Sequence, residues 1–330
     1  MIKAFVFGKF LPFHKGHEAM INFALNTCDF LSVLVCCSDK EEISSSIRKK
    51  WIENAFFGIP KIEIREYTYF ESELPNTSES SEEVSKIWAT IFRQQFPEYS
   101  IIISSEEYGY FVAKYMTIKH IAFDIPKQIF PISASTIKKN GYANWNYLPK
   151  SVKPYFSIKV VLLGTESTGK TTLTQKLSSY FNCSQVEESA RDIIANSKAF
   201  SFSDLERVAK EHSLRITNSC SGESRLVIID TNVYTTISYS RFVFGQELDL
   251  EEDIYATNTA NLYLYLDKEI EFVQDGTRLT EDERNLLDFS HRQVLRENSI
   301  DFIEISGTWQ ERFEQVIEQI NLLVNATKTF

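Results

Sequence analysis

The sequence contains no uninterrupted apolar run of the ~18 to 20 residues that a membrane-spanning helix needs. Its opening stretch, MIKAFVFGKF, is broken by a charge and then by a glycine, which does not fit a signal peptide. Cysteine is scarce, and the absence of any CxxC spacing argues against a zinc framework, while an odd number excludes a complete set of disulfides. We therefore expect an unexported protein of the reducing cytoplasm. The five cysteines are Cys28, Cys36, Cys37, Cys183 and Cys220.

Positive charge is also in short supply. The 35 Lys and Arg residues are outnumbered by 45 Asp and Glu residues, which leaves a formal net charge of −10 at pH 7. A protein that binds nucleic acid or an anionic membrane without specificity has to oppose this mean field with local cations. We therefore expect neither nucleic acid nor a membrane as a partner, and the composition leaves homo-oligomer formation open.

What is present is a globular composition, with 43% hydrophobic residues over 330 positions, enough for about two domains of ~100 to 200 residues each. The first stretch alternates an apolar strand at Ile2–Phe7, a turn at Gly8, an amphipathic helix from His17 and a second apolar strand at Phe30–Cys36. Strand, helix and strand in this order predict a parallel α/β sheet with helices on both faces. Ligands gather at the carboxyl ends of such strands.

The segment LPKSVKP, with two prolines and two lysines, is the strongest linker signal in the chain. We place a first domain at 1–148, a linker at 149–155 and a second domain at 156–330. Within the first domain, the acidic and serine-rich segment 71–85 is predicted to be a surface loop, and IIIS at 101–104 another buried strand.

The second half repeats the alternation of strands and helices, so it too is predicted to be an α/β domain with a parallel sheet. The expected strands are Phe156–Leu163, Arg225–Ile229, Leu262–Leu266 and Phe302–Ile305, and the expected helices are Leu173–Phe181, Phe202–Leu214, Asp282–Glu297 and Trp309–Val324.

A phosphate-binding motif follows the first of these strands. GTESTGKT matches G-x-x-x-x-G-K-[ST] between an apolar strand and a helix, which is the context that its mechanism requires. Backbone amides and the helix amino end cradle phosphates, Lys170 neutralises the β and γ oxygens, and Thr171 is a ligand for Mg²⁺. A glycine turn with a solvent-facing lysine is the weaker alternative. The expected ATP-binding residues are Gly164, Thr165, Glu166, Ser167, Thr168, Gly169, Thr171 and Thr172.

A carboxylate for the metal is expected from the strand RLVIID, which ends in Asp230. Taken alone this residue fits a turn cap equally well, but strand order in a P-loop fold brings it beside the phosphates. Further on, VQDGTRLTEDER offers Asp275, Arg278 and Arg284 in a polar segment typical of a closing lid. For Arg284, a solvated helix face is an equal alternative.

A second anion site is predicted at GKFLPFHKGH, where a strand ends at Gly8 and a helix begins near Gly16. His14 and His17 at a helix amino end can donate to phosphate oxygens, and Lys9 adds a full positive charge. A metal site is the rival interpretation, but two histidines without a third ligand make an incomplete set.

This stretch resembles the HxGH signature of the nucleotidylyltransferase superfamily, in the form found in nicotinamide-nucleotide adenylyltransferases, and Phe10 and Gly16 fall within it. ISAST, followed by Lys138, is similar to the family motif ISxSxxR. The resemblance implies that Ser133 and Ser135 bind ATP phosphates together with Lys138, or Lys139, in place of arginine. A lysine keeps the charge but loses bidentate recognition.

An adenylyltransferase joined to a P-loop kinase resembles the NadR-type bifunctional proteins over nearly the whole chain. The resemblance implies a Rossmann-like nucleotidylyltransferase fold followed by a P-loop kinase fold, and a role for Glu188 and Arg191 of EESAR in nucleoside binding. The aromatic residues that the family carries in this segment are missing, and the family's IDTD is IDTN here, with Asn232 last. Because the sequence starts at the first catalytic strand, we expect no DNA-binding helix-turn-helix.

The resemblance implies that ATP phosphorylates nicotinamide riboside, and that the resulting nicotinamide mononucleotide then receives an adenylyl group from ATP, giving NAD and pyrophosphate. Asp275 joins Glu188 and Arg191 as an expected substrate contact, Arg278 is assigned to ATP, and Asp230 is either the base or a Mg²⁺ ligand. Trp88 is a candidate for stacking on nicotinamide, although a core position fits equally well. Two alternatives stay open: a different phosphorylated cofactor precursor, or a nucleotide sensor without turnover.

Overall fold

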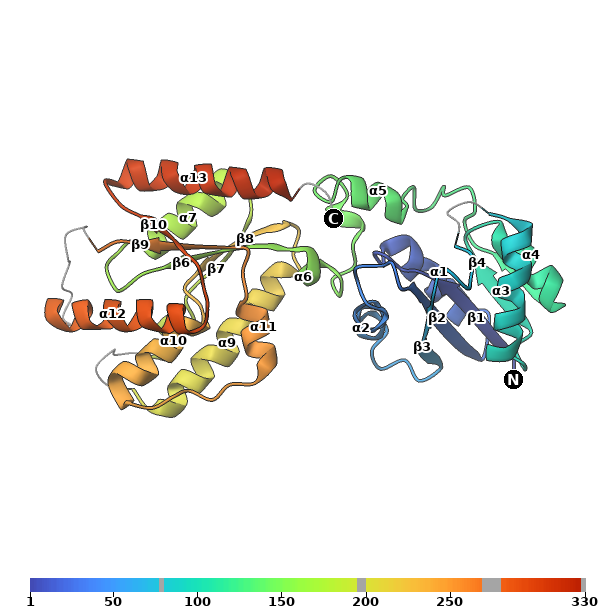
Figure 1. Cartoon of the computed structure of the whole chain (residues 1–330), viewed down its shortest axis with the longest axis horizontal. Helices are drawn as coiled ribbons and strands as arrows, with labels where there is room; N and C mark the ends of the chain where they lie inside the picture. Colours follow the sequence, from blue (N-terminus) through green and yellow to red (C-terminus); the bar gives the residue numbers. More distant parts are fainter. Residues whose placement is uncertain (77–79, 195–199, 269–279, 328–330) are drawn as a thin grey trace. The chain divides into compact units, whose positions relative to one another are not determined.

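The computed structural model describes residues 1–76, 80–194, 200–268 and 280–327. The chain forms two compact units, and it passes from the first to the second between Val152 and Lys153. Each unit contains a parallel sheet of five strands with helical connections (Figure 1). This change of unit falls within the segment 149–155 predicted as a linker, and part of that segment is the short helix α6 (Lys153–Phe156).

The sheet of the first unit has the order β3-β2-β1-β4-β5, so its first strand is central. Its core lies where Phe5, Leu34 and Ile102 of the sheet pack against Phe92 and Val112 of the helices. The strands are β1 (Lys3–Gly8), β2 (Phe30–Ser38), β3 (Ile62–Tyr69), β4 (Ile101–Ser104) and β5 (Lys119–Ala122). The helices are α1 (Lys15–Leu25), α2 (Ser45–Ala55), α3 (Glu82–Gln95), α4 (Tyr108–Met116) and α5 (Ala134–Lys139), followed by a 3₁₀ turn at Trp145–Tyr147.

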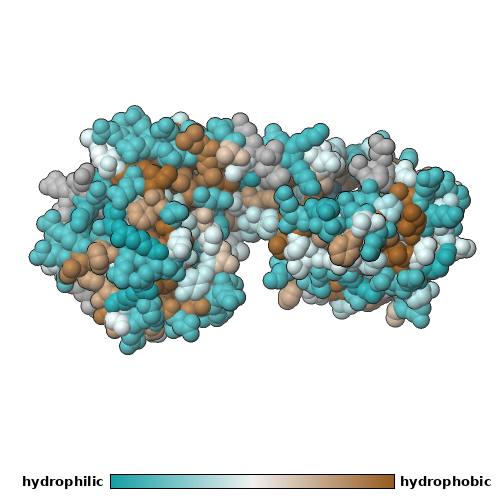
Figure 2. Space-filling view, in the orientation of Figure 1, coloured by the Kyte–Doolittle hydropathy of each residue, from teal (hydrophilic) through white to brown (hydrophobic). Residues whose placement is uncertain are grey.

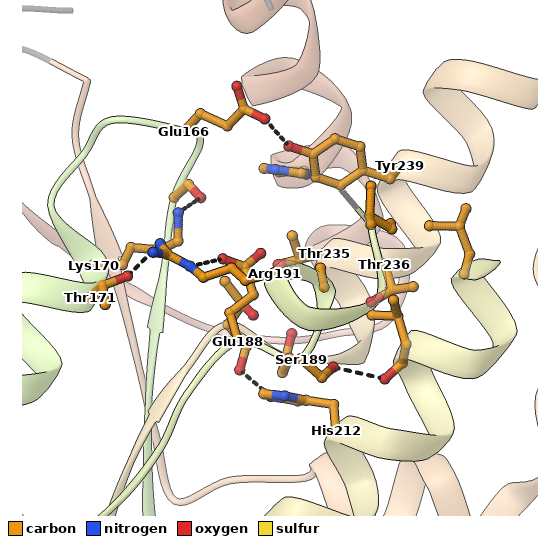
Figure 3. A pocket seen from close by; sticks show the side chains of 18 of the residues that line it. Glu166, Lys170, Thr171, Glu188, Ser189, Arg191, His212, Thr235, Thr236 and Tyr239 are labelled. Atoms are coloured by element: carbon orange, nitrogen blue, oxygen red, sulfur yellow. Dashed lines mark hydrogen bonds and ion pairs between the residues drawn. The ribbon is translucent and has the colours of Figure 1, made fainter. Parts of the chain in front are cut away.

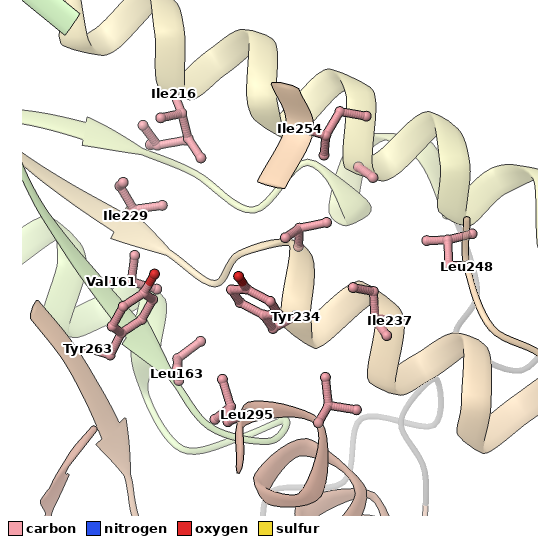
Figure 4. Close-up of a cluster of buried hydrophobic side chains, with 14 of the residues drawn as sticks. Val161, Leu163, Ile216, Ile229, Tyr234, Ile237, Leu248, Ile254, Tyr263 and Leu295 are labelled. Carbon is pink, nitrogen blue, oxygen red and sulfur yellow. The ribbon is translucent and has the colours of Figure 1, made fainter. Parts of the chain in front are cut away.

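The sheet of the second unit has the order β10-β9-β6-β8-β7, and again the first strand of the unit, β6, lies in the middle. Apolar side chains from this sheet and from α9 and α10, among them Val161, Ile229, Ile216 and Ile237, form the core shown in Figure 4. The strands are β6 (Ile158–Leu163), β7 (Ser184–Val186), β8 (Leu226–Asp230), β9 (Leu262–Leu266) and β10 (Ile303–Ile305). The helices after α6 are α7 (Lys170–Phe181), α8 (Ala190–Ile193), α9 (Phe202–Cys220), α10 (Val233–Tyr239) with a π turn at Ser240–Phe244, α11 (Glu252–Asn258), α12 (Glu281–Glu297) and α13 (Trp309–Ala326).

The predicted fold class is confirmed, since both units are parallel α/β sheets. The predicted loop at 71–85 was too long, because α3 begins at Glu82, where the Ser81 side chain accepts a hydrogen bond from the backbone amide of Val84. No strand was predicted at β3, whose residues are mostly half-buried or exposed and carry no apolar run. The short elements β5, β7 and α11 were not predicted either, because tertiary pairing rather than local pattern defines them.

The visible face of the molecule is mostly hydrophilic and is interrupted by small hydrophobic groups (Figure 2). In the described part of the chain, no helix combines the length and the apolar character that crossing a membrane would require.

Candidate active sites

The phosphate loop of the second unit joins the end of β6 to the start of α7. Gly164 has φ of +137°, and a Cβ atom there would lie 2.8 Å from the carbonyl oxygen of Leu266, so a side chain is excluded on two grounds. The Lys170 ammonium donates to the carbonyl oxygens of Gly164 and Thr165, both at 2.8 Å. The loop therefore curls around its own lysine, as a phosphate-binding loop does.

Asp230 lies at the carboxyl end of β8, next to the central strand β6. Its Oδ2 accepts a hydrogen bond from Thr171 Oγ1 at 2.5 Å, and its buried Oδ1 has no partner among the described residues. Burial raises the pKa of Asp230, and the nearby Lys170 ammonium opposes this shift. A hydroxyl and a carboxylate at this position fit Mg²⁺, which takes one or two protein oxygens and completes its shell with phosphates and water. No group of three or more His, Cys, Asp or Glu residues forms a separate metal site in the described ranges.

A cavity of about 500 Å³ opens beside the phosphate loop. Figure 3 shows Glu166 and Lys170 of the loop on one side of the cavity, and the α10 residues Thr235, Thr236 and Tyr239 on the other side. Residues of α8 and α9, together with Ile194 and Phe200, form a further wall, and much of this wall is apolar, with Leu205 and Val208 beside these two residues. The cavity thus continues from a charged end, suited to phosphate, into a partly apolar space that a flat ring can occupy.

Most of the predicted residues of the second unit are brought together here. Glu166, Ser167, Gly169, Thr172, Glu188 and Arg191 all line the cavity. Arg191 donates to Thr171 Oγ1 at 2.6 Å and to Glu188 Oε2 at 3.3 Å, so this pair lies at the phosphate end. Thr165 and Thr168 instead stabilise the loop internally, because the buried Thr168 hydroxyl donates to the Thr165 carbonyl at 2.9 Å. Asp275 and Arg278 lie outside the described residues.

Several residues of this site carry no signal in the sequence. His212 of α9, His291 of α12 and Tyr239 of α10 line the cavity, and none belongs to a recognisable motif. Burial lowers the pKa of His291 to about 3 and, with the Lys170 ammonium nearby, keeps its ring neutral. Tyr239 donates a hydrogen bond to Glu166 Oε1 at 3.2 Å. Arg284 is buried and donates to Thr165 Oγ1 at 3.3 Å, so the alternative that placed Arg284 on a solvated helix face was wrong.

The two histidines of the first unit form a stacked pair at the amino end of α1. Their ring centroids lie 3.7 Å apart, and His17 Nδ1 accepts a hydrogen bond from the His14 backbone amide at 3.4 Å. A Cβ atom at Gly16 would lie 3.0 Å from the His14 ring, so a glycine at this position leaves space for the imidazole. Burial lowers the pKa of His14 to about 4 and that of His17 well below its usual value. In the absence of a ligand both rings are therefore neutral at pH 7.

Lys9 is not a free charge, because its ammonium lies 2.9 Å from Glu41 Oε1. The other Glu41 oxygen pairs with the fully buried Arg48 at 2.7 Å, and Arg48 also donates to the Lys9 carbonyl at 2.8 Å. Burial lowers the pKa of Lys138, and the carboxylate of Glu41 acts in the opposite direction. Neither Glu41 nor Arg48 was found from the sequence, since both belong to stretches without a motif.

The structure places the remaining predicted residues of the first unit in three different environments. Ser133 caps α5 by accepting from the Thr136 amide at 3.2 Å, and Ser135 is exposed on the same helix. The Phe10 ring is buried and lies over Gly8, 3.5 Å from the position of a Cβ atom there. Trp88 is a core residue: its indole donates to the Pro75 carbonyl at 3.0 Å and packs against Tyr69 and Phe92, which agrees with the core alternative. The position of Trp88 therefore does not support stacking on a nicotinamide ring.

Fold and sites together define a protein with a nucleotidyltransferase-like α/β domain followed by a P-loop kinase-like domain. Family models agree with this division. Residues 4–98 match the "Citrate lyase ligase C-terminal domain" and residues 159–312 match an "AAA domain".

Comparison with known proteins extends this result to the whole chain. It is 25% identical over 342 residues to the "Trifunctional NAD biosynthesis/regulator protein NadR" of Escherichia coli (strain K12), with 96% of this chain and 82% of that protein covered. The protein of the same name from Salmonella typhimurium matches equally well, at 25% identity over 340 residues. The fold agrees with a crystal structure of NadR in complex with NR, at a TM-score of 0.69 and 18% identity over 98% of this chain and 96% of the other. A NadR structure with NAD and AMP-PNP gives a TM-score of 0.68 at 18% identity, with the same coverage of both chains. The chain is therefore similar to the NadR proteins over nearly its whole length.

Proposed function

We propose that this chain is a bifunctional enzyme of NAD biosynthesis that phosphorylates nicotinamide riboside in its second unit and adenylylates nicotinamide mononucleotide in its first. The observation that carries the proposal is the cavity beside Lys170, which joins a phosphate loop to a space of nucleoside size. The similarity to NadR, whose name describes NAD biosynthesis, supports the assignment of the nucleoside.

In the kinase reaction, the ribose 5′-hydroxyl attacks the γ-phosphorus of ATP and ADP leaves. The backbone amides of the loop and Lys170 hold the phosphates and stabilise the charge that develops on the transferred group. Thr171 and Asp230 would hold Mg²⁺, which supplies further positive charge to the β and γ oxygens. Because Asp230 is wholly buried and hydrogen-bonded to Thr171, it is better placed to be a carboxylate ligand of the metal than to accept the proton of the substrate.

In the adenylyl transfer, the phosphate of nicotinamide mononucleotide attacks the α-phosphorus of ATP and pyrophosphate leaves. A phosphate monoester is ionised at neutral pH, so alignment and charge stabilisation suffice and no protein nucleophile is needed. His14 and His17 at the amino end of α1 supply N–H donors, and a triphosphate beside them raises their proton affinity. Lys9 and Lys138 contribute positive charge, with Glu41 holding Lys9 in place.

The proposal is tested by incubating the purified protein with ATP, Mg²⁺ and nicotinamide riboside and following the products by mass spectrometry. We expect the mononucleotide first, with ADP, and then NAD with pyrophosphate. Accumulation of the mononucleotide alone would remove the adenylyl transfer from the proposal, and the absence of ADP release would remove the kinase.

A substrate panel separates this function from its alternatives. Phosphopantetheine and flavin mononucleotide are offered in place of nicotinamide mononucleotide, with pyrophosphate release as the readout. Faster turnover of either compound would reassign the first unit, and nucleotide binding without turnover of any substrate would indicate a sensor.

A further inference from the structure

Four buried polar atoms in the wall of the kinase cavity have no hydrogen-bond partner among the described residues. Two are the ring nitrogens of His291 on α12, and the other two are Nδ1 of His212 and Nδ2 of Asn232. The exposed fraction is 3% for His212 and 1% for Asn232. Buried polar atoms are nearly always paired, and one left unpaired lowers stability, so two together at a cavity wall point to a ligand that pairs with them.

The hydrogen-bonding character of His212 is fixed by its other nitrogen. Nε2 lies 3.1 Å from the carbonyl oxygen of Thr231, which can only accept, so Nε2 carries the hydrogen. Burial lowers the pKa of His212, which keeps the ring neutral. Its Nδ1 therefore has a lone pair and acts only as an acceptor.

Asn232 has the opposite character. Its Oδ1 caps α10 by accepting a hydrogen bond from the Tyr234 amide at 3.1 Å. This bond sets the orientation of the side-chain amide, so that the unpaired atom is the NH₂ group, which only donates. The cavity wall thus offers one acceptor and one donor.

The position of this pair along the cavity follows from its neighbours. Leu205, Val208 and His212 are spaced three and four residues apart, so they lie on one face of α9. His212 bonds to Thr231, the residue directly after Asp230, which puts the imidazole at the phosphate end of this face. Val208 and Leu205 continue away from the phosphates toward Phe200, and they form the apolar part of the wall. A nucleoside whose 5′-hydroxyl points to the phosphate loop therefore has its ribose next to His212 and its ring farther along.

We propose that His212 and Asn232 bind the ribose hydroxyls of the nucleoside and make the kinase selective for ribonucleosides over deoxyribonucleosides. This inference rests on the proposed kinase function. A hydroxyl group both donates and accepts, so it satisfies a lone pair and an NH₂ group together, whereas a C–H group at the same place satisfies neither. An analogue that lacks the hydroxyl leaves both buried groups unpaired.

The test compares kcat/KM for nicotinamide riboside with kcat/KM for its 2′-deoxy and 3′-deoxy analogues. For the wild-type protein we expect the riboside to exceed at least one deoxy analogue by on the order of 100-fold. His212→Leu and Asn232→Ser should each reduce this ratio to about 10-fold or less, mainly by lowering kcat/KM for the riboside. Serine keeps the cap on α10 while removing the NH₂ group, so Asn232→Ser decides the question if His212→Leu does not fold.

His291→Leu is the control, because it is the same replacement of a buried histidine in the wall of the same cavity, on α12 rather than α9. The ring nitrogens of His291 also lack a partner among the described residues, but they lie near the Lys170 ammonium, at the phosphate end that all three nucleosides share. This variant is expected to leave the ratio of riboside to deoxy analogue unchanged, whatever it does to the absolute rate. A wild-type ratio near 1, or a ratio that neither His212→Leu nor Asn232→Ser alters, overturns the inference while leaving the kinase proposal intact. A wild-type protein that phosphorylates none of the three nucleosides overturns the kinase proposal itself.

Discussion

The indole of Trp309 lies directly against the backbone of Gly169. A Cβ atom at Gly169 would lie 2.0 Å from Cη2 of the indole, and Gly169 has φ of +86°. Trp309 is the first residue of α13 and Gly169 is the last loop residue before α7, so the contact pins α13 to the end of the phosphate loop. The conformation of the loop thus depends on a residue 140 positions later in the sequence.

We predict that Gly169→Ala reduces kcat/KM of the kinase by about 100-fold or more, because the loop must shift away from the indole. Trp309→Leu in the same chain should restore part of the activity. The restoration stays incomplete, since a left-handed backbone still costs alanine about 1 to 2 kcal/mol. The measurement is ADP release over a series of nicotinamide riboside concentrations for both single variants and the double variant. A double variant no more active than Gly169→Ala would show that the indole is not the obstacle.

Lys170→Met should separate the two activities. We expect ADP release from nicotinamide riboside to fall by about 100- to 1000-fold, because one charge that stabilises the transferred phosphoryl group is lost. Formation of NAD from supplied nicotinamide mononucleotide should continue at the wild-type rate, since the first unit holds its own phosphate site. Equal loss of both activities would mean that the two units do not work independently.

Asp230→Asn keeps the shape of the side chain and removes its charge. We predict a fall of about 100-fold in kcat of the kinase, together with a higher Mg²⁺ concentration for half-maximal rate. The amide can still accept the hydrogen bond from Thr171, so the melting temperature should not fall. The check is a Mg²⁺ titration of ADP release. An unchanged Mg²⁺ requirement with a lowered kcat would favour proton acceptance by Asp230.

The stability of the first unit should depend on pH through its buried histidines. Burial lowers the pKa of His14 to about 4, whereas the unfolded chain has a value near 6.5. Below about pH 6.5 the unfolded state therefore binds a proton that the folded state does not, and stability falls until the pH reaches about 4. The slope approaches about 1.4 kcal/mol per pH unit in this window, and His17, whose pKa burial also lowers, acts in the same direction.

The variant His14→Asn isolates this effect, because asparagine is favoured at the N-cap of a helix and does not titrate. Calorimetric unfolding of both proteins from pH 7.5 to 4.5 should show the wild type losing more stability than the variant as the pH falls. Parallel curves would mean that His14 is exposed enough to titrate normally in the folded protein.

The alternation of strands and helices in both halves followed from local patterns, although β3, β5, β7 and α11 did not, and the two phosphate motifs could be recognised in the same way. A P-loop can be recognised from its sequence because glycines, lysine and threonine act through the backbone that joins one strand to the next helix. The same holds for the histidine pair, since a spacing of three residues at the start of a helix places both rings on one side of that helix. Asp230 could be placed because a buried strand ends in a charge.

Other parts of the sites depend on contacts between distant residues, and no local pattern records these. Glu41 and Arg48 lie close to Lys9 only because the sheet brings their segments together. Trp309 contacts Gly169 only because α13 packs against the phosphate loop. His212 resembles any helical histidine until its bond to Thr231 fixes its hydrogen and leaves a lone pair in the cavity wall. The sequence by itself determined which phosphate chemistry the chain carries, because that chemistry resides in short backbone loops. Only the tertiary structure decided which side chains surround the substrate, because burial and pairing across the fold set the charge and the hydrogen-bonding direction of each group.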